Sequence, residues 1–142
     1  MVKRILVDVA IGVGLAVAGQ IAQLIASIVG PALGLPFPYE MAPEDGSVPA
    51  ALVTQINLMF WLASILMLAL AFLLGWLLKV RGPRNGLTHG AIWATVVGLS
   101  QAVLGLGQGT VNVMGLLGTW AYLLAIVLGP VLAGLVGGRR AA

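Results

Sequence analysis

Three long stretches without a charged residue constrain this chain more than any other feature. Residues 9–39, 48–78 and 85–138 contain no Asp, Glu, Lys or Arg. A bilayer core about 30 Å thick is spanned by about 20 apolar helical residues, so each of the first two stretches accommodates one crossing. The third stretch is too long for a single helix rising about 1.5 Å per residue. It therefore predicts two further crossings.

Composition supports a membrane protein and excludes several classes of chemistry. Of the 142 residues, 61% are hydrophobic and 8% are charged, whereas about 25% of the residues of a soluble domain are charged. With no cysteine and one histidine, the chain cannot form disulfides, Cys-ligated metal centres or bis-His haem sites. Since no nucleophile, metal cluster or paired carboxylate is visible in the apolar stretches, we expect neither an enzyme nor a cofactor.

We predict one all-α membrane domain, a bundle of four transmembrane helices. Prolines and glycines mark its boundaries because they interrupt helices or favour turns. The predicted helices cover about 5–30, 50–79, 88–106 and 113–137, and they are joined by an outer loop at 31–49, an inner loop at 80–87 and an outer turn at 107–112.

The basic residues test this count, because Lys and Arg concentrate in cytoplasmic segments. They lie before the first helix, between the second and third helices, and after the fourth: Lys3, Arg4, Lys79, Arg81, Arg84, Arg139 and Arg140. Four crossings place all of them on one side, whereas three or five would not. We therefore expect a multi-pass protein of the plasma membrane with both termini in the cytoplasm. Because these residues do not gather on one solvated face, no nucleic-acid partner is expected.

Small and amide residues form two seams suited to close helix packing. In the first helix the seam is Gly12, Ala16, Gly19, Gln23, Ala26 and Gly30, and in the third it is Ala91, Ala94, Gly98, Gln101, Gly105 and Gln108. If the two seams meet, Gln23 and Gln101 are predicted to form a hydrogen bond.

The polar side chains of the apolar stretches are concentrated in the outer half of the predicted bundle. The candidates are Gln20, Gln23, Ser27, Gln55, Asn57 and Gln101. In one interpretation they only join helices, at about 0.6 kcal/mol per hydrogen bond. In the other they line an outward-facing cavity for a small polar solute. We favour the first.

Asp8 and His89 are the only ionisable residues expected within the helices, each near a cytoplasmic end. As a pair they would form a proton-linked gate, since ionisable groups inside membranes often mark ion paths. The simpler alternative places both at headgroup depth in contact with water, and we favour it.

These features predict a non-catalytic structural or accessory subunit, or an oligomeric scaffold, assembled through small-residue seams. Its partners would be the lipid bilayer and either further copies of the chain or a larger membrane complex. The alternative is a small oligomeric channel or transporter for a neutral or cationic solute. No small-molecule ligand can be identified from the sequence.

Overall fold

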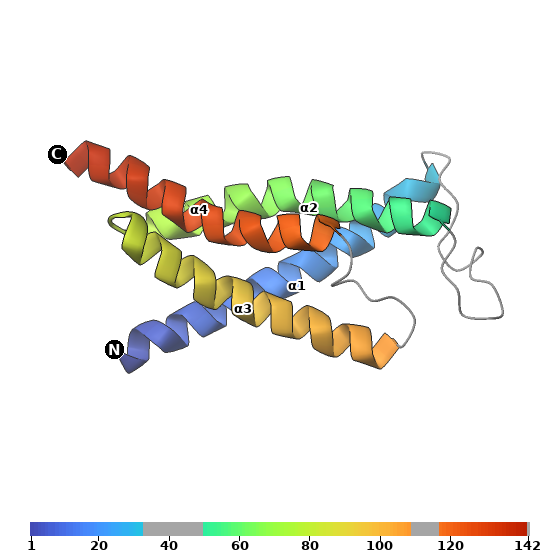
Figure 1. Ribbon diagram of the computed structural model, residues 1–142, viewed down its shortest axis with the longest axis horizontal. Helices are drawn as coiled ribbons and strands as arrows, with labels where there is room; N and C mark the ends of the chain where they lie inside the picture. Colours follow the sequence, from blue (N-terminus) through green and yellow to red (C-terminus); the bar gives the residue numbers. More distant parts are fainter. Residues whose placement is uncertain (33–49, 109–116, 142) are drawn as a thin grey trace.

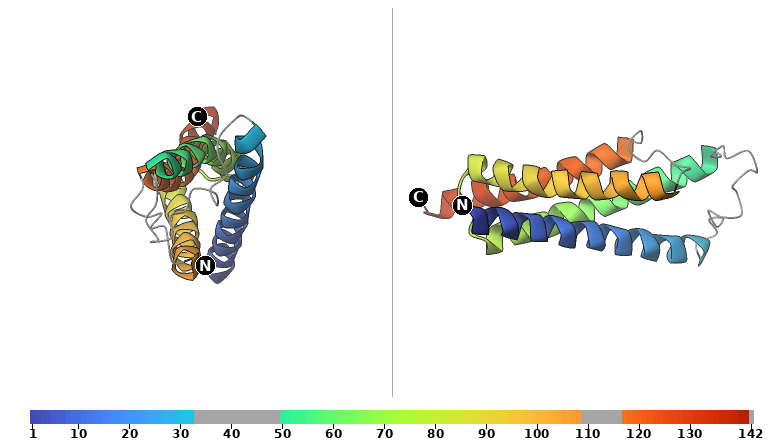
Figure 2. Two further views of the ribbon diagram at one scale, coloured as in Figure 1. Left: turned by 90° about the vertical axis from the view of Figure 1, so that its right-hand side faces the viewer. Right: turned by 90° about the horizontal axis from the view of Figure 1, so that it is seen from below.

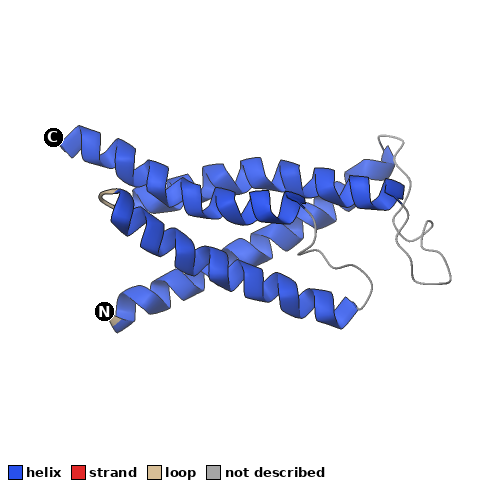
Figure 3. Ribbon diagram, viewed as in Figure 1, coloured by secondary structure: helices blue, strands red, loops and turns tan. Residues whose placement is uncertain are grey.

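The computed structural model describes residues 1–32, 50–108 and 117–141, and these residues form four α-helices. The helices are α1 (Val2–Ala32), α2 (Ala50–Leu77), α3 (Pro83–Gln108) and α4 (Leu117–Ala141). They run along the long axis of the molecule as a bundle (Figure 1), and Figure 3 shows no strand among the described residues. The predicted all-α, four-helix architecture is confirmed.

The helix boundaries differ from the predicted ones at several ends. α1 continues through Ala32 instead of ending near residue 30, and α4 continues to Ala141 instead of ending near 137. α3 begins at Pro83 rather than near 88, because proline suits the first helical turn, where its missing N–H leaves no hydrogen bond unmade. Most of the predicted outer loop and outer turn lies outside the described residues.

Both chain ends and the α2–α3 turn lie at the same end of the bundle (Figure 2). The turn contains a helix-ending motif in which the N–H of Val80 donates to the carbonyl of Gly75 and the N–H of Lys79 donates to that of Trp76, both at 3.0 Å. This hydrogen-bond pair is the Schellman motif, which requires a left-handed residue at its fifth position. Lys79 occupies that position with φ 54°.

α2 and α4 pack through small residues. A Cβ atom added to Gly129 of α4 would lie 2.6 Å from the Cβ of Ala71 and 2.7 Å from the backbone nitrogen of Phe72. A Cβ atom added to Gly75 of α2 would in turn lie 3.0 Å from the Cα of Pro130 of α4. Only residues without a side chain allow the two backbones to approach so closely.

Large side chains fill the centre of the bundle, and all four helices contribute them. The most deeply buried are Leu15, Phe60, Met67, Trp93, Val97, Tyr122 and Ile126, each at most 2% exposed. The rings of Phe60 and Tyr122 meet edge to face with their centroids 6.0 Å apart, an arrangement that aromatic pairs favour.

At the glycines whose surroundings the structure describes, the two predicted seams do not face each other. Gly12 of α1 lies against the side chain of Val96 of α3, but Gly19 lies against the hydroxyl of Tyr122, which belongs to α4. The nearest side chain to Gly98 of α3 is Leu123, also of α4. At Gly98 the predicted seam of α3 lies against α4 and not against α1, so the prediction that the seams meet fails at this position.

Three of the helices contain segments long and apolar enough to cross a membrane: Val2–Ala22, Phe60–Leu77 and Gly118–Gly137. In the described part of the chain, α3 gives no segment of this kind. The outer surface of the bundle carries many exposed large apolar side chains, as expected for a surface that faces lipid.

Candidate functional site

A buried polar cluster joins α1 to α3. Asp8 of α1 is only 2% exposed. Its two carboxylate oxygens each lie 2.7 Å from Nδ1 of His89, and Oδ1 also accepts a hydrogen bond of 2.9 Å from the indole Nε1–H of Trp93. The structure thus places the candidate residues Asp8 and His89 in direct contact, with Trp93 as a third member.

The spacing of the two α3 residues explains how they reach the same carboxylate. His89 and Trp93 are four residues apart, so their side chains project from the same face of the helix, one turn apart. Burying a carboxylate is costly unless hydrogen bonds compensate for the lost water. An indole N–H only donates, and a histidine that faces a carboxylate donates when its hydrogen is on Nδ1. Trp93 therefore donates to Asp8, and His89 donates to it in the form that has a hydrogen on Nδ1.

The simpler alternative from the sequence, with both ionisable residues in contact with water, does not describe Asp8. Its burial comes from the crossing of α1 over α3, which sequence periodicity does not show. The side chain of His89 retains 24% exposure. Trp93 was not identified as a site residue, although its spacing from His89 was an available signal.

An open cavity of about 480 Å³ lies next to this cluster. Its lining includes Asp8, His89 and four cationic side chains, those of Lys3, Arg4, Lys79 and Arg81. We call it the basic cavity. Two of the cations come from the first turn of α1 and two from the α2–α3 turn. In the sequence these residues indicate only the topology, because their convergence on one cavity depends on the fold.

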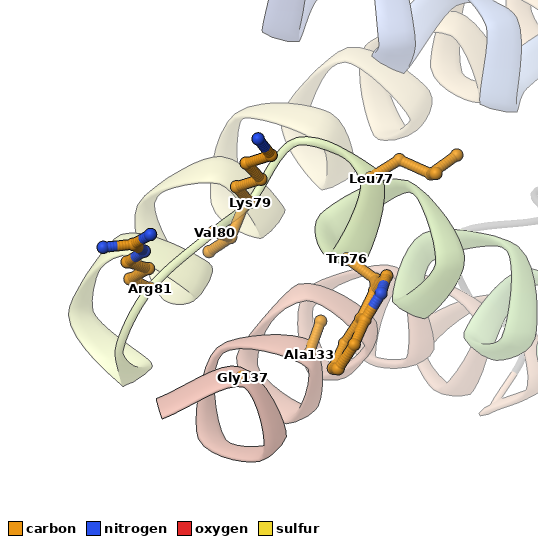
Figure 4. Close-up of a pocket in the computed structure, with 7 residues that line it drawn as sticks. All are labelled: Trp76, Leu77, Lys79, Val80, Arg81, Ala133 and Gly137. Carbon is orange, nitrogen blue, oxygen red and sulfur yellow. The ribbon is translucent and has the colours of Figure 1, made fainter. Parts of the chain in front are cut away.

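A separate hollow of about 450 Å³ lies on another side of the α2–α3 turn, between α2 and α4. Figure 4 shows the ring of Trp76 beside Ala133 of α4, while Lys79 extends from the turn away from α4. Lys79 and Arg81 contribute to both hollows. The α2–α3 turn therefore presents two cationic side chains to both hollows.

Beyond their crossing, α1 and α3 leave a groove of about 670 Å³ between them. It is lined mainly by aliphatic side chains, with Gln20 and Ser100 as its polar members. The hydroxyl of Ser100 donates to the backbone carbonyl of Val96 in its own helix. This groove is lateral and largely apolar, and it does not resemble a hydrated pathway.

The other candidate polar residues are described only in part. Gln101 is buried, with 4% exposure. The side chains of Gln23, Ser27, Gln55 and Asn57 lie outside the described part of the structure. The Gln23–Gln101 hydrogen bond therefore stays a prediction.

Within the described residues, no group of three His, Cys, Asp or Glu side chains is arranged to hold a metal ion. No protein-family model matches the sequence, and searches of curated proteins and of solved structures find no similar chain.

Proposed function

We propose that the chain is a four-pass protein of the plasma membrane with both termini in the cytoplasm, and that it acts as a non-catalytic subunit that pairs with a second copy of itself. The topology is supported by the common position of the termini and the α2–α3 turn at one end of the bundle (Figure 2). In membrane proteins generally, the segments rich in Lys and Arg face the cytoplasm. α3 has 26 residues, a length of about 39 Å, which suffices for a crossing beside α4.

The filled centre of the bundle argues against a transport pathway through one copy. The side chains of Met67, Trp93 and Ile126 are fully buried there, and a conducting route along the axis would require them to move.

The observation that carries the proposal is a groove of about 680 Å³ on the lateral surface between α3 and α4. Ala94, Gly98 and Ala102 of α3 line it at intervals of four residues. Small residues at this spacing allow close approach of another transmembrane helix, and packing of this kind drives helix association in lipid.

The same face supplies side chains able to fill such a groove. Leu99 and Leu124 line its edges and are 63% and 59% exposed. A two-fold symmetric dimer places identical surfaces against each other, so hollows and projections must occur on one face. This face contains both, which favours a second copy as the occupant.

Gly98→Leu tests the proposal. A Cβ at Gly98 would meet only Leu123, at 3.8 Å, so the substitution leaves the monomer intact while the longer side chain occupies the groove. Gly14→Leu is the matched control, because a Cβ at Gly14 meets nothing within 4 Å.

We expect the wild-type chain and Gly14→Leu to have the mass of a dimer in mild detergent, and Gly98→Leu to have the mass of a monomer with unchanged thermal unfolding. A monomeric wild-type chain, or a Gly98→Leu variant that remains dimeric, would contradict the proposal.

A channel or transporter is the second candidate. It is favoured by the ionisable pair of Asp8 and His89 beside an open cavity. Four cationic side chains around that cavity oppose entry of a cation, which leaves a neutral solute. Uptake of a labelled neutral solute such as glycerol by proteoliposomes, above the rate of empty vesicles, would favour this function over the first.

A further inference from the structure

The basic cavity concentrates positive charge that the described residues do not neutralise. Lys3 and Arg4 approach it from α1, and Lys79 and Arg81 approach it from the α2–α3 turn. Within the described residues, the one ion pair is that between Asp8 and His89. None of the four cations therefore has a carboxylate of the described chain within 4.0 Å.

Asp8 lines the cavity but does not serve as the counterion of these cations. Its carboxylate is directed to His89 and Trp93, and the residue is 2% exposed. Four like charges around one hollow repel each other, so the cavity is electrostatically suited to an anion from outside the chain.

The backbone at Lys79 provides an independent observation. Its φ of 54° places a residue with a side chain in the left-handed region, at a helix-ending position where glycine is strongly preferred. The sequence thus places a cationic side chain at a position where glycine would make the turn more stable. Unfavourable backbone conformations of this kind cluster at ligand-binding sites.

The dimensions and chemistry of the cavity fit a phosphate group. A volume of about 480 Å³ lies within the range of about 300–1,000 Å³ typical of small-molecule sites. Arg4 and Arg81 supply planar guanidinium groups, which bind phosphate oxygens in pairs, while the lysines act as point charges. Basic pockets on the cytoplasmic side of membrane proteins bind phospholipid headgroups through the same chemistry.

We propose that the basic cavity binds a phosphate group, carried either by an anionic phospholipid headgroup or by a soluble phosphate compound. The site lies at the end of the bundle that holds both termini, away from the α3–α4 groove. Binding at this site is therefore separable from self-association.

The test uses the purified full-length chain in detergent and two probes, dioctanoyl phosphatidic acid and inorganic phosphate, each titrated by calorimetry. Lys79→Gly is the principal variant because it removes one cation while giving the turn its preferred residue. Without a ligand, its thermal unfolding temperature should equal or exceed that of the wild type. Its affinity for the bound probe should fall about fivefold, the effect of about one Lys or Arg contact.

Arg84→Gln is the matched control, since Arg84 is exposed near the same turn but does not line the cavity. Its affinity should stay within about twofold of the wild type, because Arg84 does not line the cavity and salt weakens the effect of an exposed charge outside it. Saturable binding of phosphatidic acid alone would identify a lipid headgroup as the ligand, and competition by inorganic phosphate would identify a soluble one. Failure of both probes to bind, or equal losses in Lys79→Gly and Arg84→Gln, would overturn the proposal.

Discussion

The two helix pairs α2–α4 and α1–α3 are held together in different ways. α2 and α4 approach through Gly75, Gly129 and Ala133, with atoms of one backbone against the other. α1 and α3 cross each other (Figure 1), meet at Gly12 and at the buried Asp8 cluster, and then leave a groove of about 670 Å³. One pair is in contact over much of its length, whereas the contacts described for the other lie at residues 8–12 of α1 and 89–96 of α3.

The difference illustrates two ways of holding a pair of helices together. Close packing gains many small dispersion contacts, and it tolerates no added volume. A buried hydrogen-bonded carboxylate provides a strong local connection and leaves the rest of the helix less constrained. We therefore expect α2–α4 to be sensitive to the size of a side chain, and α1–α3 to be sensitive to its polarity.

The largest effect should come from adding volume between α2 and α4. In Gly129→Val the new side chain would overlap Ala71 and the backbone of Phe72. We expect a loss of about 3 kcal/mol in the free energy of unfolding, measured by titration with a denaturing detergent. Gly14→Val changes a glycine with open space around it. This variant should unfold at nearly the same concentration of denaturing detergent as the wild type. Equal losses of unfolding free energy in the two variants would contradict the expectation that the α2–α4 contact is sensitive to side-chain size.

A smaller effect is expected when polarity is changed between α1 and α3. Asp8→Asn keeps the shape of the side chain but removes the charge that strengthens the hydrogen bonds from His89 and Trp93. The free energy of unfolding should fall by about 1.5–3 kcal/mol. The indole N–H resonance of Trp93 should also move upfield in an NMR spectrum of ¹⁵N-labelled protein. An unchanged resonance would show that Trp93 does not donate to Asp8.

The smallest effect should arise at Tyr122, where α1 and α2 both meet α4. Its hydroxyl is buried against Gly19 and has no hydrogen-bond partner among the described residues. Removal of an unpaired buried hydroxyl is nearly neutral or stabilising, so Tyr122→Phe should unfold within about 0.5 kcal/mol of the wild type or at higher stability. A loss of more than about 1 kcal/mol would indicate that a water molecule or another group satisfies the hydroxyl.

The sequence was sufficient to predict four helices because the uncharged stretches and the prolines mark them directly. Periodicity also identified Gly12 and Gly19 as packing positions. It could not predict that they contact two different helices, Gly12 against α3 and Gly19 against α4, because the crossing angle of α1 depends on contacts distant in the sequence.

The candidate site was predictable only in part. Asp8 and His89 stood out as rare ionisable residues in apolar stretches, so the sequence could suggest that they pair. The role of Trp93 and the convergence of Lys3 and Lys79 on one cavity depend on how α1 lies against the α2–α3 turn. Tertiary packing of this kind leaves no periodic signal in a single sequence.

The proposed topology places the α2–α3 turn and both termini together on the cytoplasmic side of the membrane. Because the chain has no cysteine, Arg84→Cys introduces a single thiol at an exposed position in the first turn of α3, directly after the α2–α3 turn. A membrane-impermeant maleimide should label it only after cells are permeabilised, whereas Ser47→Cys in the predicted outer loop should be labelled in intact cells. Labelling of Arg84→Cys in intact cells, with Ser47→Cys protected, would contradict the claim.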